Sequence, residues 1–206
     1  FGINLINEGT GLIGPKAAVT APQGVYWMSY NNFYVYNGSV KHLPCSVHNY
    51  VFNDINLVQS FKIHAFTIKD KSEVGWFYCS SGSDEIDRYV IYNYVENLWF
   101  YGQLLRTAWL DSGIENYPRA VGDAVLYQQE KGFNDDGSPM TNVFIESSDL
   151  DIGDGDQFSF LKRIIPDYKF IEDVNSGNVN IVLKTRNFPG DSLTTNSTNT
   201  VSANTQ

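Results

Sequence analysis

Cysteine is scarce in this sequence. Cys45 and Cys79 are the only two among 206 residues, and neither lies in a CxxC or Cys/His pattern, so no zinc site is predicted. Two buried free thiols are expected instead, because free cysteine is among the most buried residue types. No apolar run approaches the roughly 20 residues of a membrane-spanning helix. No charged segment precedes a short apolar one, so no signal peptide is expected.

Basic side chains are also few. Fourteen Lys and Arg stand against 23 Asp and Glu, which gives a net charge of −9. Proteins that grip DNA neutralise its phosphates with Lys and Arg, so this balance argues against a DNA-gripping module. It is compatible with a wall along which DNA slides without binding. Hydrophobic residues make up 42% and charged residues 18%, which indicates a globular chain.

The sequence lacks the short motifs of several enzyme classes. No G-x-S-x-G, G-x-G-x-x-G or Walker motif is present. The three histidines, His42, His48 and His64, form no H-x-H or H-x-x-x-H pair. The sequence therefore predicts no catalytic residue and no cofactor.

Aromatic residues, in contrast, are abundant at 15%, and they favour strands. Three segments read as strand, polar break and strand: 24–38, 73–94 and 123–147. Trp27, Trp76 and Tyr127 anchor them at spacings of 49 and 51 residues. A hairpin that recurs at about 50 residues is typical of β-propellers, in which aromatic rings fill the space between blades.

The predicted fold is therefore mainly β, with propeller-type repeats of about 50 residues. Residues 1–187 form the propeller-type domain, with blades at about 19–68, 69–121 and 122–187, and 188–206 form a Ser/Thr/Asn-rich loop or flexible tail. Strands are expected at 157–165 and 178–187. A closed propeller needs more than three blades, so the chain is expected to be a fragment of a larger one.

One segment departs from the strand pattern. Val47, Tyr50, Val51, Ile55 and Val58 follow helical spacing, and Ser46 is a plausible N-cap. One helix, at about 47–59, is therefore expected between the first two blades.

Two acidic clusters are candidate sites. Asp149, Asp151, Asp154 and Asp156 alternate with glycines, as in calcium-binding turns, but their spacing matches no EF-hand loop, and Asp and Gly are ordinary turn residues. They are weak calcium candidates. Asp84, Glu85 and Asp87 could do the acid–base work of a glycosidase, yet the S-x-D-x-G-x-x-W box of sialidase-like propellers is absent, and a solvated loop is the expected alternative.

The central region resembles the tail nozzle proteins of short-tailed bacteriophages, the tail tubular protein B type and its DNA-stabilisation relatives. The matching residues are Glu73, Trp76, Ser80 to Ser83, Asp87 to Val90, Trp99, Gly102 and Arg106 to Trp109. The segments 146–167 and 47–59 resemble the same family, so the likeness covers about 14–187. Family members are longer and carry a basic segment downstream that this chain lacks.

This resemblance implies a structural role in the virion. Such nozzles are homohexameric rings below the portal and adaptor, carry tail fibres, and extend the channel through which the genome leaves. The family has no catalytic residues to carry over. An acidic wall suits that role, because like charge repels the phosphate backbone and confines DNA without sequence-specific binding.

Two other functions remain open at this stage. One is a glycan-binding or glycan-cleaving propeller of phage or bacterial origin. The other is a kelch-like protein-interaction module whose loop tips carry the binding.

Overall fold

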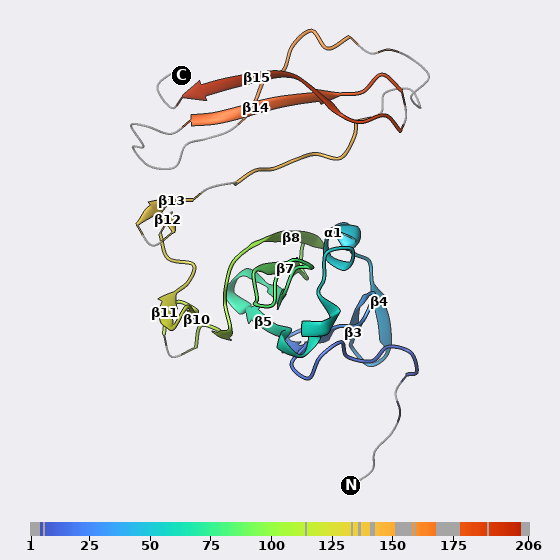
Figure 1. Cartoon of the computed structure of the whole chain (residues 1–206), viewed down its shortest axis with the longest axis vertical. Coiled ribbons are helices and arrows are strands. Elements are labelled where there is room, and N and C mark those ends of the chain that lie inside the picture. The colour runs from blue at the N-terminus through green and yellow to red at the C-terminus, as the bar shows by residue number, and fades with distance from the viewer. Residues whose placement is uncertain are drawn as a thin grey trace. The chain divides into compact units, whose positions relative to one another are not determined.

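The computed structural model describes most of the chain. The described residues are 5, 7–113, 115–132, 134–135, 137–140, 143–150, 158, 160–167, 178–188 and 190–202. The chain divides into two compact units, 1–139 and 140–206 (Figure 1).

Antiparallel strands build the first unit. In chain order its elements are β1 (Ala18–Ala21), β2 (Gly24–Met28), β3 (Phe33–Tyr36), β4 (Val40–Leu43), α1 (His48–Phe52), the 3-10 helix η1 (Leu57–Lys62), β5 (His64–Ile68), the 3-10 helix η2 (Lys69–Lys71), β6 (Glu73–Tyr78), β7 (Arg88–Asn93), β8 (Leu98–Gln103), β9 (Ala108–Leu110), β10 (Arg119–Gly122), β11 (Val125–Gln128), β12 (Asn134–Asp135) and β13 (Ser138–Pro139). Strands β1–β4 form sheet 1, β5–β8 form sheet 2, β9–β11 form sheet 3, and β12 and β13 form a small hairpin. In sheets 1–3 each strand pairs with the next one along the chain.

The aromatic hairpin of β7 and β8 turns where the sequence breaks to polar residues. Asn97 adopts a left-handed φ of 59°, which asparagine tolerates better than most residues. The Asn93 side chain accepts hydrogen bonds from the backbone N–H groups of Val95 and Glu96, and Tyr92 donates its hydroxyl to the Asn97 side chain. These local bonds fix the register of the pair.

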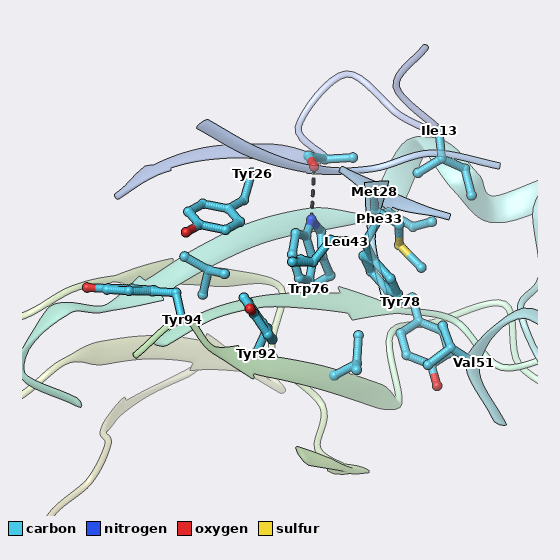
Figure 2. Close-up of a cluster of buried hydrophobic side chains, with 14 of the residues drawn as sticks. Ile13, Tyr26, Met28, Phe33, Leu43, Val51, Trp76, Tyr78, Tyr92 and Tyr94 are labelled. Atoms are coloured by element: carbon cyan, nitrogen blue, oxygen red, sulfur yellow. Dashed lines mark hydrogen bonds between the residues drawn. The ribbon is translucent and has the colours of Figure 1, made fainter. Parts of the chain in front are cut away.

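The main core lies between sheets 1 and 2. Alternating residues of β6 and β7 point toward sheet 1, and Tyr26, Met28 and Phe33 of sheet 1 meet them. Trp76, fully buried, lies in the middle and donates its indole N–H to the Ala17 carbonyl at 2.9 Å (Figure 2). Burial of several large aromatic rings makes this contact a dominant source of stability.

A second core covers the opposite face of sheet 2. Phe66, Phe77 and Ile86 are buried there, and Trp109 of sheet 3 packs against them. Trp109 donates its indole N–H to the Thr67 carbonyl at 3.0 Å. Because sheet 2 is covered on both faces, β6 reads as a nearly continuous apolar run instead of an alternating one.

The first strands of the three sheets lie beside one another. The Ala65 N–H donates to the Lys16 carbonyl at 2.8 Å, and Lys16 and His64 form a parallel bridge next to β1. The bond from Trp109 to Thr67 joins β9 to β5 in turn. Sheets 1, 2 and 3 are therefore stacked in chain order, with β5–β8 in the middle (Figure 1).

The mainly β class, with several antiparallel sheets and few helices, is confirmed, whereas closure into a propeller stays a prediction. The sheets lie at 18–43, 64–103 and 108–128, not at the predicted blades 19–68, 69–121 and 122–187. The predicted boundaries differ because Tyr127 is not equivalent to the two tryptophans. Trp27 and Trp76 lie on the second strands of their sheets, but Tyr127 lies on the third strand of its sheet. The spacing of 51 residues is therefore not the period of a structural repeat.

The helix predicted at 47–59 is confirmed only over α1, and its continuation to 59 is wrong. Five residues form α1, and the chain then breaks before η1. Asn56 caps η1 by accepting from the Val58 N–H, and such side-chain bonds compete with helix continuation. The predicted N-cap Ser46 is also wrong, because Val47 holds that position without a side-chain bond.

The second unit contains one long hairpin of β14 (Asn178–Thr185) and β15 (Thr194–Ser202). The predicted strand at 178–187 is confirmed in β14. The flexible tail predicted at 188–206 is wrong for 194–202, where β-branched threonines suit a strand and Thr200 donates to the Asn180 side chain at 2.8 Å. The strand predicted at 157–165 is wrong for 158 and 160–165, and the strand predicted to end the third hairpin is wrong for 143–147, since none of these residues pairs.

Candidate functional site

The acidic loop between β6 and β7, residues 79–87, gathers the predicted acid–base candidates. Asp87 closes this loop. Its carboxylate accepts from the Ser80 backbone N–H at 2.8 Å, from the Ser80 hydroxyl at 2.7 Å and from Arg88 at 2.8 Å. One carboxylate thus satisfies three donors, which is the pattern of a structural clamp.

The segment between α1 and η1 holds the tip of the acidic loop. Ser81 donates its hydroxyl to Asp54 at 2.8 Å, and Asn56 donates its side-chain amide to the Ser83 carbonyl at 3.0 Å. Arg88 lies 3.7 Å from the second oxygen of Asp54. Sequence reasoning missed Asp54 and Asn56, because they lie more than 20 positions away from their partners and belong to no motif.

The two remaining acidic candidates also have partners of their own. Asp84 accepts from the Gln59 side-chain amide at 3.1 Å, and Glu85 accepts from Lys62 at 2.8 Å. The hydrogen bond to Glu85 raises the pKa of Lys62. The three carboxylates are thus each engaged by a different side chain, as a braced surface loop requires.

The two cysteine thiols and the Tyr78 phenol of the first unit keep their protons at neutral pH. Burial raises the pKa of the Cys79 thiol to about 11, and it raises that of Cys45 to the same value. Burial also raises the pKa of Tyr78, whose buried hydroxyl has no hydrogen-bond partner. A thiol or phenol that keeps its proton is a poor nucleophile. Both cysteines are free thiols, as predicted, but the predicted burial is confirmed only for Cys79, because Cys45 is half-buried.

The histidines each contact a partner of their own. His42 and His48 contact two neighbouring residues of the β2–β3 turn, the Asn32 side chain and the Asn31 carbonyl, and His64 stacks on Phe77 with ring centroids 5.1 Å apart. Among the described residues, no group of three or more His, Cys, Asp and Glu is placed to hold a metal ion.

His64 makes stability depend on pH. Burial lowers its pKa below the ordinary 6.5, with Lys16 contributing, and its Nε2 is buried without a partner. The unfolded chain therefore binds a proton more readily than the folded chain, and stability falls as the pH drops through 6.5. We expect the wild type to lose more stability between pH 7.5 and 5 than His64→Gln, measured by urea unfolding. Equal losses in both chains would contradict this.

The calcium candidates are only partly placed. Asp149 forms an ion pair with Arg186 at 2.7 Å, whereas Asp151, Asp154 and Asp156 lie outside the described residues. We predict that this loop binds no calcium, because its spacing matches no calcium loop and Asp149 already has a cationic partner. Calorimetric titration should show no binding. A dissociation constant tighter than about 10⁻⁴ M, the range of extracellular calcium modules, would contradict the prediction.

A small apolar hollow of about 80 Å³ lies between sheets 2 and 3. Rings of Phe66, Phe77, Tyr89 and Trp109 line it, and Glu130, which is paired with Lys71, stands at its edge. It is smaller than a drug-sized ligand site by severalfold. The sequence carried no signal for it, because its walls come from both sheets.

No known family model matches this chain, and no curated protein is similar to it at a significant level. In the part of the chain that the structure describes, no helix is both long and apolar enough to cross a bilayer.

Proposed function

We propose that this protein is a structural component of a phage virion tail, a nozzle subunit that lines the DNA ejection channel below the portal and adaptor. It acts as a homohexamer, carries contacts to tail fibres, and passes the genome without sequence-specific binding. The resemblance of the central region to tail nozzle proteins supports this function. So does the net charge of −9, because an acidic wall repels phosphates.

The main support for a non-enzymatic function is that the carboxylates of the acidic loop accept hydrogen bonds from other groups of the protein. Asp87 clamps the loop, and Asp84 and Glu85 brace it against Gln59 and Lys62. A general acid or base must reach a substrate proton, whereas these carboxylates already pair with side-chain or backbone donors of the same chain.

A propeller-type arrangement of the β domain is part of the proposal. Its support is the stacking of three consecutive antiparallel sheets whose first strands adjoin, with sheet 2 buried on both faces. Propeller blades pack in this manner, and each one needs its neighbours to cover its faces.

The experiment tests whether the loop carboxylates catalyse glycan cleavage. We expect the purified protein to cleave no host-surface glycan, and phage particles with Asp84→Asn, Glu85→Gln and Asp87→Asn together to release their DNA. Because Asp87 also supports the fold, the double variant Asp84→Asn with Glu85→Gln serves as the matched control. Glycan hydrolysis that disappears in the double variant would contradict the nozzle function and favour the glycan-cleaving alternative.

A further inference from the structure

Asn37 and Gly38 form the only Asn-Gly pair in the sequence. They lie with Ser39 in the turn between β3 and β4, where Tyr36 pairs with Val40. Gly38 adopts a φ of 104°, in the region that favours glycine, and a Cβ added there would meet no atom within 4 Å. The main chain next to the Asn37 side chain is therefore sterically open.

Two other turn asparagines are held by hydrogen bonds of their side chains, whereas Asn37 is not. The Asn32 side chain contacts a histidine ring at 2.9 Å, and the Asn97 side chain accepts from the Tyr92 hydroxyl at 2.7 Å. In the part of the chain that the structure describes, neither the Asn37 side chain nor the Gly38 N–H has a hydrogen-bond partner. Nothing in this turn therefore keeps the Asn37 side-chain carbonyl away from the Gly38 nitrogen.

We propose that Asn37 is a site of spontaneous modification, at which the folded chain converts this asparagine into aspartate and isoaspartate. Asparagine is among the thermolabile residues of proteins. The Gly38 nitrogen attacks the carbonyl carbon of the Asn37 side chain, loses its proton and closes a five-membered succinimide ring. The side-chain nitrogen leaves as ammonia and takes up a proton in exchange.

Hydrolysis of the succinimide gives the two products. Water that opens the ring at the side-chain carbonyl gives aspartate, and water that opens it at the main-chain carbonyl gives isoaspartate. No bond is oxidised or reduced, and water is the only other reactant. Either product adds one negative charge to a chain whose net charge is −9.

Isoaspartate alters the end of sheet 1. Its main chain runs through the former side chain, so the three-residue turn gains one carbon atom next to the pair of Tyr36 and Val40. The register of a hairpin depends on the length of its loop. The turn between β1 and β2 is also affected, because a Cβ at Gly24 would lie 2.3 Å from the Tyr36 carbonyl oxygen and 3.4 Å from the Asn37 Cβ. The modification therefore loosens the pairing of β3 with β4.

The test is tandem mass spectrometry of peptides from the purified full chain after incubation at pH 7 and at pH 9. We expect fragments that contain Asn37 to gain the mass difference between a carboxylic acid and an amide, while Asn32 and Asn97 stay unmodified. The change should be faster at pH 9, because the attacking nitrogen must lose its proton. Labelling of one of two separated products by an isoaspartate methyltransferase should identify isoaspartate.

Two variants separate the chemistry from its effect on the hairpin. Asn37→Gln is the matched control, because its longer side chain cannot close the five-membered ring, so it should stay unmodified. Freshly purified Asn37→Asp carries the charge of the products without the lengthened main chain. It should keep the wild-type midpoint of urea unfolding, whereas wild type enriched in isoaspartate should unfold at lower urea.

Two results would overturn the inference. One is an Asn37 that stays intact in the folded chain as long as Asn97 does, and the other is modification that occurs only when the chain is unfolded in urea. Equal urea midpoints for the isoaspartate-enriched wild type and Asn37→Asp would overturn the loosened pairing of β3 with β4.

Discussion

Trp76→Ala should lower the free energy of unfolding by about 3–5 kcal/mol, the range for removing a fully buried large aromatic side chain. Trp76 is fully buried between sheets 1 and 2, and its ring lies 4.7 Å from that of Phe33. The substitution opens a cavity in the main core and leaves the Ala17 carbonyl without its indole donor. Denaturant unfolding followed by circular dichroism measures the loss.

Two further variants test whether the loss of stability in Trp76→Ala comes from the burial of its side chain. Trp76→Phe keeps most of the ring but removes the indole N–H, so it should cost about 1–3 kcal/mol, the range for an unsatisfied buried acceptor. Trp99 is only partly buried, although its indole also donates to a backbone carbonyl, that of Pro44. Trp99→Ala should therefore cost less than Trp76→Ala. Equal losses for the two alanine variants would contradict the placement of the core.

Asp87→Ala should cost about 1–3 kcal/mol, because it strips several donors of their acceptor at once. The Ser80 N–H, the Ser80 hydroxyl and Arg88 all donate to this carboxylate. The side chains of Asp87 and Arg88 are 29% and 20% exposed, so water replaces the lost bonds only in part. Thermal and urea unfolding give the free-energy change.

Glu85→Ala is the matched control in the same loop. The Glu85 side chain is 66% exposed and pairs with Lys62 at the surface, and exposed ion pairs contribute little to stability. If Glu85→Ala destabilised the protein as much as Asp87→Ala, the clamp assigned to Asp87 would be wrong.

Short-range patterns predicted local strands well. The runs of β2, β6 and β7 and the strand β14 follow from alternation and turn residues that lie within a few positions of each other. Alternation and turn chemistry act locally, so a single sequence is enough to reveal them. Local chemistry also explains why the helix predicted at 47–59 does not continue to 59. The apolar residues have helical spacing, but the Asn56 side chain caps a new 3-10 helix and interrupts the α-helix.

Long-range organisation was harder to predict. The stacking of sheets depends on contacts such as those from Trp76 to Ala17 and from Trp109 to Thr67, which join residues 59 and 42 positions apart. Where both faces of a strand carry aromatic residues, the sequence pattern does not indicate which face packs against which neighbouring sheet. The predicted blade boundaries differ from the sheet boundaries because Tyr127 lies on the third strand of its sheet, whereas Trp27 and Trp76 lie on the second strands of theirs.

The candidate site was predicted only in part. The acidic run at Asp84, Glu85 and Asp87 was visible in the sequence, but its structural use was not, since the bracing groups Asp54, Gln59 and Lys62 come from a different segment. A cluster of carboxylates looks the same in sequence whether it serves chemistry or holds a loop. Only the partners of each oxygen distinguish the two.

An electron-microscopy image of the assembled protein, viewed down its axis, tests the nozzle function most directly. The proposal predicts a ring of six copies around an acidic axial channel that is wide enough for duplex DNA. A monomer with a carboxylate-lined cleft at the centre of its sheets would contradict it and would favour the glycan-cleaving alternative.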